Sequence, residues 1–247
     1  PKLRVRYQAN DELAVKGGVG TYSQVPDIFE FNPVWGNANI GLERALHTSA
    51  GVEKKWTDLD LTVEGTAFYK HVWDIAWPSR AVLQDDETTF VPERFWSTGT
   101  GHIYGVEFLL RKELTRKLFG WVSYTLSKAL EKPDEQTPIR PFAFDQPHIL
   151  TAIAVYKLPY GWQIGGRFRL VSGNPWTPIT DGIFEAKDSE YLPIEGATNS
   201  DRLPAFHQLD LRVDKNWTFK YVAANLYLDV QNVYNARNVE GYNYSYN

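Results

Sequence analysis

Residues 204–217, PAFHQLDLRVDKNW, alternate between apolar and polar side chains over most of their length. Successive side chains of an extended strand point to opposite faces, so this stretch presents two different surfaces. The apolar surface consists of Leu209, Leu211, Val213 and Trp217. The polar surface consists of Gln208, Asp210, Arg212 and Asp214. The same period of two recurs at 59–69, 162–171 and 222–232. It predicts β-strands that each have one apolar and one polar face.

The composition excludes several classes of protein. Hydrophobic residues make up 43% of the 247 residues and aromatic residues 15%, which is too apolar for a disordered chain. The 26 basic and 30 acidic side chains give a net charge of −4, which argues against a nucleic-acid partner, because such a partner requires a clustered basic surface. Cysteine is absent, so the chain forms neither a disulfide nor a thiolate zinc site.

The hydropathy of the chain is compatible with a membrane protein that crosses by strands. No stretch approaches about 18 consecutive apolar residues, so the sequence encodes no transmembrane helix. The mean hydropathy is −0.40, a value typical of soluble proteins. A membrane β-barrel reaches a similar average, because only every second side chain of its strands faces lipid.

We expect ten strands, several of them longer than the strands of soluble proteins. They lie at 2–8, 12–23, 42–56, 59–69, 103–114, 118–128, 147–158, 162–171, 204–217 and 222–235. Soluble strands usually have about 5–6 residues, whereas a tilted strand that spans a bilayer needs about 9–11. The predicted fold is all-β, a segment of a transmembrane antiparallel β-barrel in which consecutive strands form a meander.

Short and long connections alternate between these strands. The short turns lie at 10–11, 57–58, 116–117, 159–161 and 218–220, and the long loops at 24–41, 73–102, 129–146 and 173–204. Outer-membrane barrels have short periplasmic turns and longer extracellular loops. The tryptophans divide in the same way, with Trp56, Trp121, Trp162 and Trp217 beside short turns and Trp35, Trp73, Trp77, Trp96 and Trp176 near or within long loops. Two such zones are typical of the two lipid–water interfaces, although tryptophan also favours strand ends in large β-proteins generally.

Both ends of the chain are expected on the long-loop side. The strand at 2–8 runs into a short turn, and the strand at 222–235 leaves one. An open sheet in lipid would leave two edges of unpaired N–H and C=O groups, each costing several kcal/mol. We therefore expect at least one further strand before Pro1 and at least one after Asn247.

Four stretches of the sequence carry a resemblance to a known family. They are 18–53, 104–129, 144–178 and 202–238, and they contain, in order, Leu42-Glu43-Arg44-Ala45, Tyr124-Thr125-Leu126-Ser127-Lys128, Ser172-Gly173-Asn174-Pro175 and Leu228-Asp229-Val230-Gln231-Asn232-Val233-Tyr234-Asn235. In this order and spacing, the motifs resemble the C-terminal part of the barrel of a TonB-dependent outer-membrane receptor.

The resemblance implies a barrel of about 22 strands that is plugged by an N-terminal globular domain. Residues 1–247 would be a partial outer-membrane β-barrel domain, the C-terminal half without the plug and the last strand. Such receptors lie in the outer membrane of Gram-negative bacteria and take up iron chelates, cobalamin, sugars or peptides with energy from TonB. The implied partners are membrane lipid, the remaining strands and the plug (in the same or a separate chain), an extracellular ligand, and TonB, which would be contacted by the missing N-terminal part. The resemblance implies neither a cofactor nor an enzymatic activity.

The polar faces of the strands are expected to line the lumen of this barrel. Their charged residues are Arg4, Arg6, Lys16, Glu53, Glu64, Glu107, Arg111, Arg167, Arg169, Asp210, Arg212, Asp214 and Asp229. Mixed charge on a barrel interior can hold a plug through ion pairs and hydrogen bonds, or it can line water without a partner. The plug is the favoured interpretation, because a barrel of the implied size has a plugged lumen.

Ligand recognition is expected on the long loops, where aromatic and amide groups cluster. The candidates are Tyr22, Phe29, Phe31, Trp35, Asn37, Asn39, Trp77, Trp96, Trp176 and Tyr191. Aromatic faces suit sugars or flat chelates, and amides give directional hydrogen bonds. Packing of the loops against themselves is the alternative explanation for each of these residues.

Metal and catalytic sites are not predicted. The five histidines fall on five different strands, and the acidic run 85–87 is expected to be a solvated part of a loop. His207 and Asp210 are three residues apart on one strand, so they point to opposite faces.

Two further functions remain open at this point. One is a self-contained ten-stranded barrel protease resembling omptins, and the other is an adhesion or binding module that transports nothing. Pairing between the strands at 2–8 and 222–235 would support the closed ten-stranded barrel, whereas two unpaired edges would support the receptor.

Overall fold

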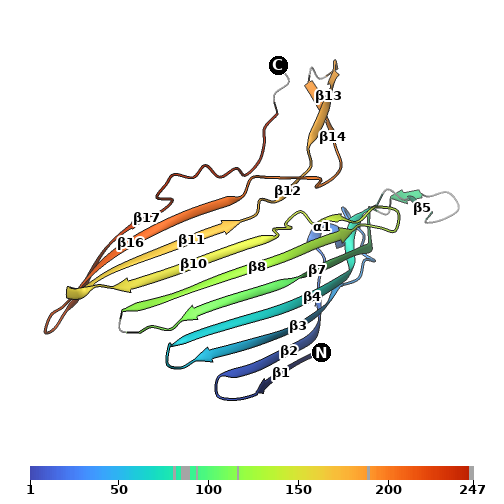
Figure 1. Ribbon diagram of the computed structural model, residues 1–247. Helices are drawn as coiled ribbons and strands as arrows, with labels where there is room; N and C mark the ends of the chain where they lie inside the picture. The colour runs from blue at the N-terminus through green and yellow to red at the C-terminus, as the bar shows by residue number, and fades with distance from the viewer. Residues whose placement is uncertain (80–81, 85–89, 93, 116, 188–189, 245–247) are drawn as a thin grey trace.

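The computed structural model describes all residues except 80–81, 85–89, 93, 116, 188–189 and 245–247. The chain forms one long, curved antiparallel sheet (Figure 1) in the strand order β1-β2-β3-β4-β7-β8-β10-β11-β16-β17. Its strands are β1 (Lys2–Gln8), β2 (Leu13–Gln24), β3 (Glu43–Trp56), β4 (Leu61–Pro78), β7 (Phe95–Lys112), β8 (Leu118–Lys132), β10 (His148–Lys157), β11 (Trp162–Val171), β16 (Phe206–Thr218) and β17 (Ala223–Val230). The predicted meander of ten strands is confirmed.

The smaller elements lie in the connections. All but one belong to the long-loop end: α1 (Ile28–Phe31), β5 (Val82–Gln84), β6 (Phe90–Pro92), β9 (Arg140–Pro141), β12 (Pro175–Trp176), β13 (Ile179–Glu185), β14 (Glu190–Glu195) and β15 (Asp201–Arg202); the 3₁₀ turn η1 (Pro159–Gly161) closes a short turn. β13 and β14 form a hairpin that stands away from the main sheet (Figure 1). In the described part of the chain, no helix is long and apolar enough to cross a membrane.

Three strands extend further toward the long-loop end than the sequence pattern predicted. β4 continues to Pro78 and β7 begins at Phe95, so the loop predicted at 73–102 is much shorter in the structure. The pairing of these two strands shifts register between Val72 and Ile75 and again between Ile75 and Trp77. Each shift interrupts the alternation of side chains, because an irregular residue moves the following ones to the other face. β8 likewise extends to Lys132.

β17 is shorter than predicted. It ends at Val230 rather than at residue 235. Asn232 and Asn235 both have positive φ angles, of 51° and 52°, and such residues turn the chain out of an extended conformation. Val233 and Tyr234 follow, but position 232 of the apolar face is already an Asn, and the backbone does not remain a strand.

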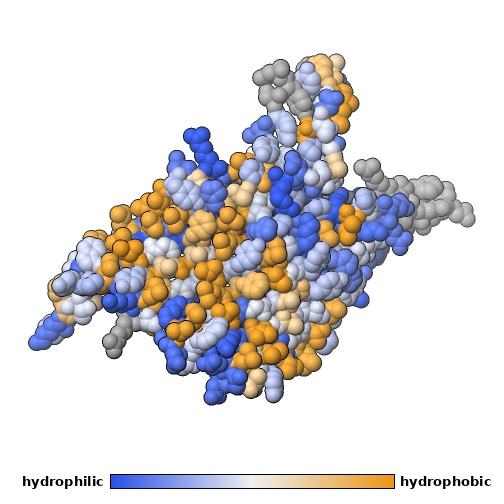
Figure 2. Space-filling model, viewed as in Figure 1, coloured by the Kyte–Doolittle hydropathy of each residue, from blue (hydrophilic) through white to orange (hydrophobic). Residues whose placement is uncertain are grey.

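The sheet is a single layer with one apolar face. The cross-strand register places Leu211 beside Gly166 and Val213 beside Ile164, on the face opposite to Arg212 and Asp214. These apolar side chains remain open, with Leu211 40% and Ile164 45% exposed. Apolar atoms gather over the sheet in Figure 2. A contiguous apolar face of this extent, without a covering layer among the described residues, requires an apolar environment.

The two edge strands do not pair with each other. β1 pairs with β2 and β17 pairs with β16, and they lie at opposite ends of the strand order. The alternative of a closed ten-stranded barrel, as in an omptin-like protease, is therefore wrong for the described chain. Each edge has free N–H and C=O groups that can accept another strand.

A charge on the apolar face should destabilise the protein in a membrane. We expect Leu211→Arg, in a full-length protein that contains this chain, to lower the free energy of unfolding in a bilayer by about 2–4 kcal/mol, because the guanidinium would face lipid near the middle of the strand. Ser123→Arg, on the opposite face, is the matched control and should change it by less than about 1 kcal/mol. Urea titration in lipid vesicles, followed by the heat-modifiable mobility of the folded protein, measures both. Equal losses for the two variants would contradict the assignment of the faces.

Candidate functional site

All thirteen charged residues predicted for the lumen lie on one face of the sheet, and the pairing of β1, β2 and β3 places Arg4, Arg6 and Lys16 there. Direct cross-strand neighbours place Glu53 beside Glu64, Arg167 beside Asp210, and Arg212 beside Asp229. Following the register from strand to strand gives one polar face that carries Glu53, Glu64, Glu107, Arg111, Arg167, Arg169, Asp210, Arg212, Asp214 and Asp229. The polar face therefore extends over the whole width of the sheet.

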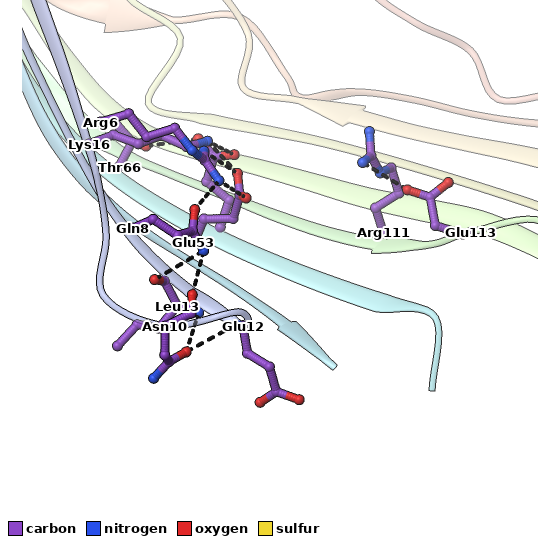
Figure 3. A network of polar contacts seen from close by, with 11 residues as sticks. Arg6, Gln8, Asn10, Glu12, Leu13, Lys16, Glu53, Thr66, Arg111 and Glu113 are labelled. Atoms are coloured by element: carbon purple, nitrogen blue, oxygen red, sulfur yellow. Dashed lines mark hydrogen bonds and ion pairs between the residues drawn. The ribbon is translucent and has the colours of Figure 1, made fainter. Parts of the chain in front are cut away.

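The first cluster on the polar face joins four strands near the short-turn end. Glu53 Oε1 lies 2.8 Å from Arg6 Nη2, and Glu53 Oε2 lies 2.5 Å from Lys16 Nζ. The same Lys16 Nζ lies 2.8 Å from Glu64 Oε2. Figure 3 shows Arg6, Lys16 and Glu53 turned toward one another on one side of the strands. Two cations and two carboxylates meet here, so the cluster has no net charge.

The second cluster lies near the β17 edge. Asp210 is 8% exposed and receives hydrogen bonds from the Arg167 guanidinium, at 2.6 and 2.9 Å, from Gln208 Nε2 and from the Asn232 backbone N–H. Beside it, Arg212 pairs with Asp214 at 2.7 Å, and its guanidinium lies 4.0 Å from the centroid of the Tyr227 ring. Charge-assisted hydrogen bonds of this kind fix the side chains on the wall.

These contacts decide what the polar face can do chemically. Glu53, Glu64 and Asp210 each pair with a cation of another strand, and Asp214 pairs with Arg212 of its own strand. The face therefore presents a fixed pattern of hydrogen-bonding groups of both charges. Arg169 instead lies over the Phe206 ring, at 5.6 Å. A shallow groove beside the first cluster is lined by Arg4, Gly18, Ser49 and Thr66. Such a surface suits a partner with matching polar groups better than an ion in transit.

The residues predicted for ligand binding are not all in loops. Tyr22 lies within β2, on the polar face, where its ring stacks on His47 at 4.3 Å. Trp77 and Trp96 lie on β4 and β7, directly opposite each other in the extended ends of these strands. Their placement in a loop was wrong, because both strands run further than predicted.

The loop before β3 carries five of the candidates, Phe29, Phe31, Trp35, Asn37 and Asn39. Asp27 and Glu30 form a capping box around α1, which fixes the start of the loop. Asn37 Nδ2 donates a hydrogen bond to the Phe95 carbonyl at 2.8 Å, and the Asn39 N–H donates to Asn37 Oδ1 at 2.9 Å. Trp35, between these anchors, is 67% exposed. The side chain of Asn37 therefore holds the loop through both hydrogen bonds, and the Trp35 indole is left open.

Trp176 packs against the end of the chain. It lies in β12, with its ring 5.8 Å from that of Tyr242 and 6.5 Å from that of Tyr244, and its Nε1 is 3.3 Å from Tyr244 Oη. Trp176 thus takes part in packing within the loop region. Within the described residues, no group of three or more His, Asp or Glu side chains could hold a metal ion, and the acidic run 85–87 lies outside them.

Comparison with known proteins agrees with this geometry. The family model for the TonB dependent receptor-like β-barrel matches residues 1–233. The chain belongs to this family. No curated protein matches the sequence.

Solved structures share the fold of this TonB-dependent receptor barrel at low identity. The FrpB iron transporter from Neisseria meningitidis is 18% identical with a TM-score of 0.63, over 96% of this chain and 35% of its own. The ferric-catecholate import receptor Fiu from E. coli K12 is 14% identical with a TM-score of 0.66, over 96% and 31%. FpvA of P. aeruginosa, bound to a heterologous pyoverdine–iron complex, is 14% identical with a TM-score of 0.66, over 96% and 29%. The chain thus spans about a third of the length of these proteins.

One buried acid, Asp145, organises the long-loop end of the receptor barrel, and the pattern of the sequence does not reveal it. Asp145 is 1% exposed and accepts hydrogen bonds from the Ala129 N–H at 2.6 Å, Lys128 Nζ at 3.0 Å and Arg202 Nη2 at 2.7 Å. Arg202 also donates to the Gly173 carbonyl at 2.7 Å. Asp145 therefore ties together the start of one long loop and both ends of another. The Asp–Gln–Pro context gave no signal for this, because the partners are distant in sequence.

The environment of Asp145 also sets its protonation. Burial on its own would raise the pKa of this carboxyl, but the hydrogen bonds from Ala129, Lys128 and Arg202 outweigh it, and the pKa lies below its ordinary value. A depressed pKa in the folded state stabilises the fold at pH values above the unfolded pKa of about 3.9. This contribution is lost as the pH falls through the lower folded pKa.

Removing the charge of Asp145 should loosen both loops. We expect Asp145→Asn to reduce hydrogen-exchange protection at 129–147 and 173–205 about tenfold, since a buried hydrogen bond to a charged group contributes about 1.5–3 kcal/mol. Mass-spectrometric hydrogen exchange on the full-length receptor measures this, with Asp181→Asn in the exposed β13 as the control. Acidification from about pH 3.9, the unfolded pKa, down through the lower folded pKa of Asp145 should reproduce the effect in the unmutated protein, and it should cause no further loss at these segments in Asp145→Asn. Unchanged protection in the variant would show that Asp145 does not hold the loops.

Proposed function

We propose that this chain forms part of the wall of a plugged receptor in the outer membrane of a Gram-negative bacterium, and that the receptor takes up a ligand from outside the cell. The observation that carries the proposal is the single-layer antiparallel sheet with one exposed apolar face, one charged face, and all long connections at one end. Membership of the TonB-dependent receptor-like barrel family supports it.

The apolar face would contact membrane lipid, and the two edges would pair with further strands. β1 and β17 each have one hydrogen-bonded neighbour, and a sheet edge is not tolerated in lipid. The wall would therefore continue on both sides into a barrel of about 22 strands. The remaining strands belong to the same or to a separate chain.

The polar face would contact the plug domain. Its ion pairs and its aligned side chains, among them Arg167 with Asp210, give fixed donors and acceptors to a packed partner. A wall that lined only water would have no need for such alignment. Because a barrel of this size requires a plug to remain closed, contact with a plug is the interpretation that accounts best for the wall.

The long-loop end would bind the ligand. Trp35, Trp77 and Trp96 lie at this end, and an exposed indole is well suited to a flat chelate. The similar structures include an iron transporter, a ferric-catecholate import receptor and a ferripyoverdine receptor. A metal chelate is therefore the ligand class that we propose, and TonB, contacted by a segment outside this chain, would supply the energy for uptake. Family members are transporters, and we propose no enzymatic activity.

Removal of the exposed indole should weaken ligand binding. We expect Trp35→Ala in the full-length receptor to raise the Kd for a cognate ferric chelate about tenfold, which is the scale of an aromatic contact in a binding site. Tyr160→Ala is the matched control, because Tyr160 is 90% exposed in a short turn at the opposite end. Intrinsic fluorescence quenching, screened over a panel of ferric chelates, measures the Kd. Equal effects of the two substitutions would contradict binding at the long-loop end.

Energised uptake can be separated from adhesion. In cells that express the full-length receptor, deletion of its TonB-contacting segment should abolish accumulation of the radiolabelled chelate while leaving its binding to the cell surface intact. The binding step and the uptake step use different parts of the receptor, so only the second should respond. Accumulation that persists without the segment, or surface binding with no accumulation in the intact receptor, would favour a binding module over a transporter.

A further inference from the structure

Tyrosine–histidine pairs recur on the apolar face of the sheet. Tyr69 Oη lies 2.8 Å from His102 Nδ1, Tyr124 Oη lies 2.8 Å from His148 Nδ1, and Tyr234 Oη lies 2.9 Å from His207 Nδ1. We call these six residues the Tyr–His belt. The pairs join β4 to β7, β8 to β10, and β16 to the segment after β17, so the belt runs across most of the sheet.

The first two pairs have the same cross-strand geometry. Tyr69 lies opposite Tyr104, and Tyr124 lies opposite Leu150. In each case the histidine is two residues further toward the long-loop end than the residue opposite the tyrosine. The ring of His71, directly opposite His102, stacks on the His102 ring at 4.7 Å and on the Trp73 ring at 5.4 Å. The repetition across separate hairpins shows an ordered row rather than a chance contact.

The belt lies at one boundary of the apolar band. At the short-turn end of the same face, Lys54 lies over the Trp56 ring and Lys215 over the Trp162 ring, which marks the other boundary. Ten residues separate Leu61, opposite Trp56, from His71. This corresponds to about 33 Å along a strand, or about 25 Å across a membrane at the usual tilt, which is the height of the apolar band of such barrels. The Tyr–His belt therefore lies where lipid headgroups begin.

The hydrogen bonds leave one ring nitrogen of each histidine for another partner. In a neutral imidazole whose Nδ1 accepts from a tyrosine hydroxyl, Nε2 carries the proton and donates. No described residue hydrogen-bonds Nε2 of His102, His148 or His207. No carboxylate belongs to the belt, so the donors that it offers suit an acceptor supplied from outside the chain.

We propose that the Tyr–His belt binds the phosphate groups of lipid headgroups in the leaflet on the long-loop side. A phosphate accepts several hydrogen bonds at once, and a row of N–H donors at headgroup height is complementary to a row of such lipids. The tyrosines orient the imidazoles, and the histidines make the contact. The inference rests on the proposed placement of the apolar face in a bilayer.

Lipid retention by the full-length receptor tests this proposal. The receptor is reconstituted into nanodiscs that contain equal amounts of phosphatidylglycerol and phosphate-free digalactosyldiacylglycerol, then mildly delipidated and analysed by native mass spectrometry. The unmutated receptor should retain phosphatidylglycerol in preference to the glycolipid. His102→Phe, His148→Phe and His207→Phe are made singly and combined. Each substitution should lower the preference for phosphatidylglycerol about fivefold, which corresponds to the loss of one ordinary hydrogen bond.

His47→Phe is the matched control. His47 also stacks on a tyrosine, Tyr22, but it lies on the polar face, so its replacement should leave the preference unchanged. Heat-modifiable mobility verifies folding. If the variant that carries all three histidine substitutions fails to fold, the three single variants are compared instead. Equal retention of the two lipids by the unmutated receptor, or an unchanged preference in the folded belt variants, would overturn the proposal. Retention of neither lipid would instead contradict the placement of the chain in a bilayer.

Discussion

An uncovered apolar face is the constraint on which the rest of the structure depends. The sheet satisfies its backbone hydrogen bonds strand to strand, except at the edges of β1 and β17. It has almost no interior, since the described apolar residues that are buried are only Ala14, Ala76, Val171 and Leu203. A soluble protein of this size would hide its leucines under a second layer. Here the apolar environment for those side chains has to come from outside the chain, and the bilayer proposed above would supply it.

The alternation of apolar and polar residues in the sequence predicted this sheet well. The prediction failed where the backbone departs from a regular strand. Regular strands such as β1 and β11 begin and end where the alternation does. The two register shifts after Val72 hid the ends of β4 and β7, because a bulge inverts the pattern without ending the strand. The positive φ of Asn232 ended β17 although apolar residues continue. Hydrophobic periodicity predicts which face of a strand a residue occupies, but it does not predict where a bulge shifts the register.

The candidate site divides in the same way. The shared face of the thirteen charged residues predicted for the lumen followed from their odd or even positions, so this part of the polar face could be predicted from the sequence. Which of those residues pair could not, since Arg167 meets Asp210 only through the register of β11 with β16. The contacts of Asp145 could not be predicted either, because its partner Arg202 lies in a different loop, 57 residues away in the sequence. The histidines looked isolated in the sequence, and only the cross-strand register shows that four of them, His71, His102, His148 and His207, share the apolar face.

The register shifts that defeated the sequence pattern also explain how the long-loop end can hold a ligand site. β4 and β7 continue as paired strands beyond the Tyr–His belt, and there Trp77 lies opposite Trp96. Gly99 makes room for this, because a Cβ at that position would lie 2.4 Å from the Trp77 ring. The Asn37–Phe95 hydrogen bond then fastens the neighbouring loop to the start of β7. The aromatic groups are thus carried by paired strands and anchored loops, which hold a binding geometry at a smaller entropic cost than free loops would.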